Sequence, residues 1–236
     1  MFITGYMPLN PNENLPADLH FRRPHPTETQ LVRPNLHVVA HSLGAQAAML
    51  AAAHAPDVFA SLTVMDPAMI PSGKIQNIFK NLPKDVFCMG FKAEYPSQEA
   101  ISAEVRKNKR TRGWDKRSAH AFIEHAAVDT GHGILRLAAH PRLEWALYYD
   151  QETPTNCYDR LKDITTPFNA IMPPKPFAVP PKVFEADVGK MATQTRITWL
   201  PGTTHQVPFE KVDECASIVA DWIKDQISID NQKAKL

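Results

Sequence analysis

The chain has 236 residues, of which 44% are hydrophobic and 22% are charged, and its formal net charge is +1. These values are typical of a soluble globular protein and exclude a wholly disordered chain, a collagen and a porin-like channel. A charge so close to zero creates no field that would attract nucleic acid or an acidic membrane. The 21 prolines, against only 9 glycines, are expected in loops.

Three cysteines, Cys88, Cys157 and Cys215, are widely spaced and form no C-x-x-C pair. This pattern favours neither a zinc site nor a redox dithiol, so we expect three unpaired thiols in a reducing compartment. The sequence also has no glycine-rich phosphate loop and no motif for a metal or a flavin. We therefore expect no cofactor and no metal.

The N-terminal part, residues 1–34, contains six prolines and little hydrophobic periodicity, which predicts an irregular arm. It begins without the basic segment of a signal peptide. Polar residues interrupt the most apolar stretch, residues 36–60, so no transmembrane helix is expected.

The following segment predicts a strand–turn–helix–strand unit. The apolar run 36–40 predicts a buried strand, the small-residue segment 45–54 a helix, and the run 61–67 a second strand that Pro67 halts. Such a unit implies a parallel sheet.

Residues 71–159 carry no strong strand pattern and predict a helical insert. Apolar residues recur at helical spacing in three segments, 97–110, 118–128 and 142–149. Seven basic residues and one acid lie between Arg106 and Arg117. Because the whole chain is nearly neutral, we interpret this run as a solvated helix face rather than a patch for an anionic ligand.

After the insert the sheet is expected to resume, so that residues 35–70 and 160–228 form one core. Strands are predicted in 167–172 and 195–200, separated by a proline-rich loop. One apolar stripe predicts a helix over 210–227. The polar end, 229–236, predicts a flexible tail.

The strongest chemical signal is Ala40-His41-Ser42-Leu43-Gly44. A serine on a tight turn between a strand and a helix is pushed out above the sheet edge, and small neighbours let the two backbones pass. The backbone N–H of Leu43 and the start of the helix would then face an oxyanion formed at Ser42. The segment differs from G-x-S-x-G in having Ala40 at the first position.

With these residues the sequence resembles the α/β-hydrolase superfamily. The resemblance implies an α/β fold with a parallel sheet, a serine nucleophile and a general base placed late in the chain. His205, in PGTTHQVPFE, lies between the last expected strand and the last expected helix and matches that base.

The carboxylate that orients the base has two possible positions in this superfamily. Asp66 follows the strand after the nucleophile helix and is our choice, because it lies at a strand end. The other position follows the strand 167–172, where no acid appears until Glu185 and Asp187, which remain the alternative.

The remaining histidines are interpreted as structural. His41 is expected to pack beside the pocket as a substrate-binding neighbour of Ser42. His120 and His125 have the wrong spacing for a zinc motif, and His132 lies in the insert, away from the nucleophile.

The insert sequences AEYPSQEAISAEVRKNKRTRGWDKRSAHAFIEHAAVD and LAAHPRLEWALYYD resemble the cap of fungal peroxisomal lipase-like hydrolases, relatives of which occur in toxin biosynthesis. The chain also ends in Ala234-Lys235-Leu236, a variant of the S-K-L peroxisomal address. We therefore expect a peroxisomal import receptor as a partner and the peroxisomal matrix as the location, with the cytoplasm as the alternative.

One departure from the superfamily concerns the N-terminal half of the sheet. Ser42 comes after an arm of about 35 residues, where the family has several strands and a loop that supplies a second oxyanion donor. The sheet is therefore expected to be incomplete, and the strand before Ser42 to lie at an exposed apolar edge, which favours aggregation, an oligomer or a partner. We interpret the chain as a truncated product or as one that needs a partner, with little activity alone.

Three functional hypotheses follow. The first is a serine hydrolase acting on an ester or acyl bond of a lipid-like or polyketide-derived substrate, through Ser42, His205 and Asp66. The alternative is a catalytically weak or inactive relative that acts as a binding protein. Other chemistry on the same scaffold, such as acyl transfer, is a third option.

Overall fold

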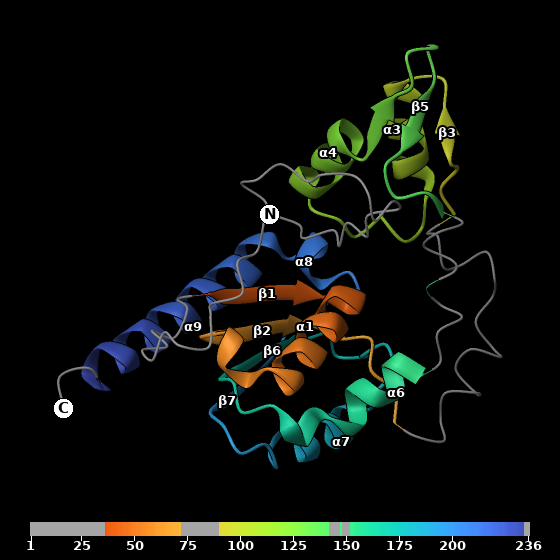
Figure 1. Cartoon of the computed structure of the whole chain (residues 1–236). Helices are drawn as coiled ribbons and strands as arrows, with labels where there is room; N and C mark the ends of the chain where they lie inside the picture. The colour runs from red at the N-terminus through yellow and green to blue at the C-terminus, as the bar shows by residue number, and fades with distance from the viewer. Residues whose placement is uncertain (1–35, 72–89, 142–146, 148–151, 234–236) are drawn as a thin grey trace, which may run out of the picture. The chain divides into compact units, whose positions relative to one another are not determined.

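Two sheets are present in the computed structural model, which describes residues 36–71, 90–141, 147 and 152–233 (Figure 1). One is parallel and has four strands, and the other is antiparallel and has three. None of the helices in these ranges combines the length and apolar character that a membrane crossing requires.

The parallel sheet confirms the four strands expected from apolar runs. In sheet order they are β1 (His37–His41), β2 (Ser61–Met65), β6 (Phe168–Met172) and β7 (Thr195–Trp199). All pairs are parallel, with Val39 beside Thr63 and Ala170 beside Ile197. Parallel strands end at the same sheet edge, so the residues that follow them are brought together.

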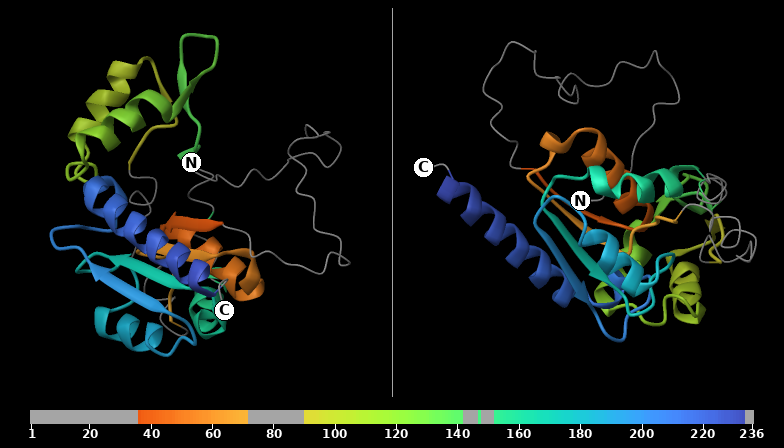
Figure 2. Two further views of the ribbon diagram at one scale, coloured as in Figure 1. Left: turned by 90° about the vertical axis from the view of Figure 1, so that its left-hand side faces the viewer. Right: turned by 90° about the horizontal axis from the view of Figure 1, so that it is seen from below.

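Helices cover both faces of this sheet (Figure 2). One face carries α1 (Ser42–His54), α6 (Glu152–Asp159) and α7 (Pro181–Val188), and the other carries α9 (Val212–Lys233). Alternation along the strands explains this arrangement, because Leu62 and Val64 join the first hydrophobic cluster while Met65 and Ile171 join the second. The connections also contain the short helices η2 (Pro56–Val58), η4 (Leu161–Asp163) and α8 (Val207–Glu210).

Strand β1 is only half-buried, and its central residue, Val39, is exposed. Within the described residues the strand pairs on one side only, with β2, and 47% of Val39 is exposed. The prediction of a buried strand at 36–40 is therefore wrong. Whether the strand lies at the edge of the complete sheet, as expected, depends on residues 1–35, which are outside the described part of the chain.

The insert contains strands that the sequence analysis did not predict. The helices α3 (Gln98–Lys107) and α4 (Lys116–His125) confirm two of its three expected helices. Beside them lies the antiparallel sheet of β3 (Glu94–Tyr95), β5 (Leu135–Leu137) and β4 (Ala127–Asp129). Strands of two or three residues are too short to leave a period-two pattern. Most of the third expected helix, 142–149, lies outside the described residues.

Two boundaries differ from those expected. Residues Cys157 and Leu161 belong to the hydrophobic core of the parallel sheet, so α6 packs with the core rather than with the insert. Helix α9 continues to Lys233, beyond the expected start of a flexible tail at residue 229. The arm 1–34 and the end of the chain, Ala234–Leu236, lie outside the described residues.

Candidate functional site

Ser42 lies at a sharp bend between β1 and α1. Its φ angle is +53°, a left-handed backbone conformation that residues other than glycine rarely adopt. A backbone hydrogen bond from Ala68 N–H to the Ser42 carbonyl, 3.1 Å long, ties the bend to the loop after β2. Ala45 is fully buried, as expected for close packing, but a Cβ at Gly44 would meet no atom within 4 Å, so the expected crowding there is not observed.

His205 joins Ser42 to Asp66 through its two ring nitrogens. Its Nε2 lies 2.8 Å from Ser42 Oγ, and its Nδ1 lies 2.6 Å from Asp66 Oδ2. A carboxylate only accepts hydrogen bonds, so Nδ1 carries the proton and Nε2 is free to accept from the serine hydroxyl. The three residues predicted from sequence are thus brought into one hydrogen-bonded chain with the geometry of a triad.

The Asp66 carboxylate is held by a backbone amide as well as by the His205 ring. Asp66 directly follows β2, has a φ angle of +38° and is only 1% exposed. The backbone N–H of Phe177 donates to both of its carboxylate oxygens, at 3.1 and 3.2 Å. Phe177 belongs to the proline-rich loop after β6, so that loop supplies an amide where the alternative prediction looked for an acid.

The alternative acids, Glu185 and Asp187, lie in α7 and are engaged elsewhere. Glu185 accepts a 2.7 Å hydrogen bond from the indole N–H of Trp199. Asp187 accepts from the Tyr158 hydroxyl and pairs with Lys190 at 2.8 Å. Neither has a hydrogen bond to His205.

His41 supports the backbone of His205 rather than its ring nitrogens. Its Nε2 lies 2.7 Å from the His205 carbonyl oxygen, which only accepts, so His41 is the donor. The two rings are 4.9 Å apart. Burial, with a smaller contribution from His205, lowers the pKa of His41 to about 4, so its ring is neutral near pH 7.

Leu43 is the second residue of α1, and 39% of it is exposed. Amides in the first turn of a helix have no partner within the helix, and the helix dipole is positive there. The Leu43 N–H therefore has the location expected of an oxyanion donor. The expectation about a second donor concerns residues 1–34, outside the described part of the chain.

Several residues at the site were missed by sequence reasoning. Phe177 stacks at a tilt on the His205 ring, 5.1 Å away. Phe209 contacts the His41 ring, and Glu210 binds the backbone of Thr204. For Phe209 and Glu210, the only sequence signal is their position four and five residues after His205, within PGTTHQVPFE.

The other candidates found in the sequence do not join this site. His120 and His125 both lie beside Glu124 on α4, and no group of metal-ligating side chains occurs in the described ranges. Cys157 and Cys215 are free thiols, as expected. Both are buried, and burial raises the pKa of the Cys157 thiol to about 12. Cys88 lies outside the described residues.

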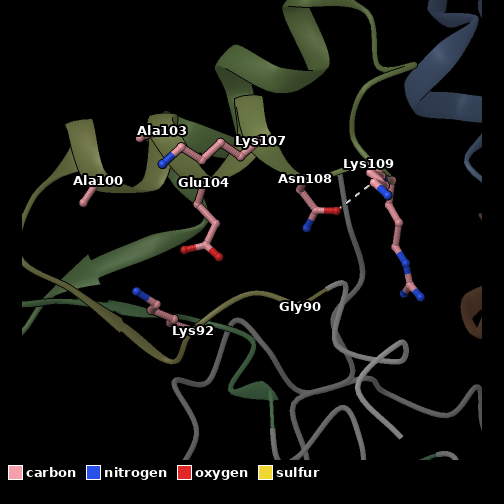
Figure 3. Close-up of a pocket in the computed structure, with 9 residues that line it drawn as sticks. Gly90, Lys92, Ala100, Ala103, Glu104, Lys107, Asn108 and Lys109 are labelled. Atoms are coloured by element: carbon pink, nitrogen blue, oxygen red, sulfur yellow. Dashed lines mark hydrogen bonds between the residues drawn. The ribbon is translucent and has the colours of Figure 1, made fainter. Parts of the chain in front are cut away.

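A cavity of about 660 Å³ opens on the insert, beside α3 (Figure 3). Its charged lining includes Lys92, Glu104 and Lys107. This cavity is separate from the triad-like arrangement, because its lining includes none of Ser42, His205 and Asp66.

Comparisons with known proteins bear on the family and the fold of the chain. Residues 8–218 match the model of the alpha/beta hydrolase family. Comparison with curated proteins gives no match. The chain is similar in structure to peroxisomal alpha-beta-hydrolase Lpx1 of Saccharomyces cerevisiae, with 16% identity and a TM-score of 0.67, covering 83% of this chain and 56% of that one. It thus spans little more than half of the yeast protein.

Two further solved structures share the fold. One is E-2-(acetamidomethylene)succinate hydrolase, with 16% identity, a TM-score of 0.61 and coverage of 82% of this chain and 68% of that one. The other is the Mycobacterium tuberculosis esterase Rv0045c, with 18% identity, a TM-score of 0.52 and coverage of 78% and 62%. Both are described as hydrolytic enzymes.

Proposed function

The chain belongs to the alpha/beta hydrolase family, and we propose that it is a serine hydrolase that cleaves an ester or other acyl bond. The observation that carries this proposal is the chain of short hydrogen bonds from Ser42 through His205 to Asp66. Three residues that are distant in sequence meet there in the order that nucleophilic acyl transfer requires.

In the proposed reaction, Ser42 Oγ attacks the acyl carbonyl while His205 Nε2 takes its proton. The tetrahedral oxyanion accepts a hydrogen bond from Leu43 N–H at the start of α1. His205 then gives the proton to the leaving alcohol, and the acyl group stays on Ser42. Water, activated by the same nitrogen, releases the acid and restores the serine.

Asp66 holds His205 in the tautomer that these reaction steps need. Its carboxylate accepts from Nδ1 and stabilises the imidazolium that forms when Nε2 takes the serine proton. The Phe177 amide limits rotation of the carboxylate, because it binds both oxygens. A serine at the nucleophile position, rather than an aspartate, argues against dehalogenase and epoxide hydrolase chemistry.

We further propose a lipid-like or polyketide-derived acyl substrate. Support comes from the resemblance of the insert to caps of lipase-like hydrolases, which is an argument from the fold. Leu43 N–H is the oxyanion donor that we assign, and one such donor contributes about 10²–10³ in rate.

Burst kinetics with p-nitrophenyl acyl esters of increasing chain length test the reaction. We expect release of about one equivalent of p-nitrophenol, followed by slow turnover, because a covalent acyl-enzyme accumulates. Ser42→Ala should give no burst. Folded wild-type protein with neither a burst nor steady release of p-nitrophenol would favour the alternative, a binding protein without catalysis.

For localisation, we propose that the terminus Ala234-Lys235-Leu236 binds a peroxisomal import receptor. A fluorescent protein fused in front of the full chain should collect in peroxisomes. Replacing Leu236 by Asp should leave the fusion in the cytoplasm. A cytoplasmic signal from the unmodified fusion would contradict the proposal.

A further inference from the structure

The loop that carries His205 is held by a carboxylate from the short helix α8. Glu210 accepts a 2.6 Å hydrogen bond from Thr204 N–H through Oε2 and a 2.7 Å bond from Thr204 Oγ1 through Oε1. Thr204 immediately precedes His205. Both carboxylate oxygens are therefore used to fix the backbone next to the proposed base.

A turn of the insert packs directly against the same helix. Asp115 N–H donates to the Phe209 carbonyl at 2.8 Å, and the rings of Trp114 and Phe209 are stacked with centroids 4.8 Å apart. Gly113 lies against Glu210 so closely that a Cβ would come within 2.9 Å of its Oε1. The insert thus leaves just enough room for the Glu210 carboxylate.

A second route connects α8 to the other side of His205. The Phe209 ring meets the His41 ring edge-on at 5.9 Å, and His41 Nε2 donates to the His205 carbonyl. Phe209 is itself stacked on Trp114 of the insert. The backbone on both sides of His205 is therefore held by groups that the insert contacts.

We infer that Glu210 is a positioning residue for His205, and that the turn at Gly113 and Trp114 of the insert keeps its carboxylate in place. For the role of His205 this inference rests on the proposed function. For the reaction, His205 Nε2 must stay 2.8 Å from Ser42 Oγ while His205 Nδ1 stays 2.6 Å from Asp66 Oδ2. Displacement of the loop by about 1 Å would break this alignment and lower the rate up to about a hundredfold.

The two contacts predict a specific coupling between Gly113 and Glu210. Gly113→Ala should slow phosphonylation of Ser42 by a fluorophosphonate by about tenfold or more, because its methyl group displaces the carboxylate. Glu210→Ala should slow it by a similar factor. In the double variant, the methyl group has no carboxylate to displace, so the rate should equal that of Glu210→Ala.

Glu214→Ala is the matched control. Glu214 lies four residues after Glu210, in the first turn of α9, is exposed and pairs with Lys211 at 2.9 Å. Its replacement should leave the labelling rate unchanged. Thermal unfolding of every variant separates loss of alignment from loss of folding.

The His205 Nδ1–H proton gives a readout that does not depend on catalysis. Its short hydrogen bond to Asp66 should give a downfield resonance in proton NMR, which Glu210→Ala and Gly113→Ala shift or broaden and Glu214→Ala does not. If the wild type is not labelled but the resonance responds as expected, the proposed function fails and the positioning role stands. If Ser42 is labelled equally in all variants, or if the effects of Gly113→Ala and Glu210→Ala add, the positioning role is wrong.

Discussion

Ser42 and Asp66 share an unusual backbone conformation. They are the only non-glycine residues with positive φ in the described ranges, and each directly follows a strand of the parallel sheet. Such conformations cost of order 1–3 kcal/mol and persist where the surrounding structure enforces them, often at functional sites. The strain is thus located at two of the three residues that the proposed reaction needs.

Asp66→Asn tests the tautomer argument. An amide donates to Nδ1 through its N–H, which moves the His205 proton to Nε2 and leaves nothing to accept from Ser42. We expect the phosphonylation rate of Ser42 to fall by about 10⁴ with the fold retained. Asp187→Asn, a change at the alternative acid, should leave that rate unchanged. An equal loss in both variants would contradict the assignment.

His41 is predicted to make the stability pH-dependent. Its folded pKa, about 4, lies below the ordinary 6.5, so between these values the unfolded state binds more protons and stability falls as pH falls. Over the whole interval between the two pKa values, the loss in the free energy of unfolding is on the order of 3 kcal/mol. His41→Gln keeps an N–H donor for His205 but does not titrate. Between pH 7 and about 4.5, urea unfolding should show a loss about 2 kcal/mol smaller in this variant. Equal losses would refute this.

At the level of elements, sequence reasoning worked where a segment carried its own local signal. The four parallel strands and the segment after Ser42 were predicted because apolar runs and helix formers are such signals. The short strands of the insert and helix α7 were missed, since tertiary packing rather than period defines them. The same holds for Phe177 and Glu210, whose roles depend on contacts between segments that no local pattern records.

Strand β1 carries the next prediction. Val39 is exposed on a strand that pairs on one side only within the described residues, which favours edge-to-edge association. Val39→Lys should reduce concentration-dependent self-association in sedimentation velocity. Val183→Lys, a change at an exposed valine of α7, is the control and should have no such effect. Unchanged association in Val39→Lys would show that this edge is not the contact.

For the whole molecule, the described residues divide into separate hydrophobic clusters. Two flank the parallel sheet, and a third, which includes Tyr95, Ile101 and Leu137, lies entirely within the insert. The sequence predicted an insert between two halves of one core, because the strand pattern stops and resumes. It could not reveal how the insert is tied to α8 and α9. Those ties depend on single contacts, such as Asp115 N–H with the Phe209 carbonyl of α8 and Arg117 with Asp213 of α9, each at 2.8 Å.

Because the insert has its own hydrophobic cluster, we expect that it can unfold locally while the parallel sheet stays folded. Ile101 is 0% exposed, so Ile101→Ala should cost about 2–5 kcal/mol. Hydrogen exchange should accelerate in α3 and α4 while β2 and β6 stay protected. Accelerated exchange throughout both sheets would mean that insert and core unfold as one unit.

The most direct test of the proposed function is intact-mass analysis after treatment with a fluorophosphonate. The hydrogen-bonded chain of Ser42, His205 and Asp66 predicts a single adduct on the wild-type protein and none on Ser42→Ala. An adduct that persists in Ser42→Ala, or folded wild-type protein that stays unlabelled, would contradict the assignment of Ser42 as an activated nucleophile.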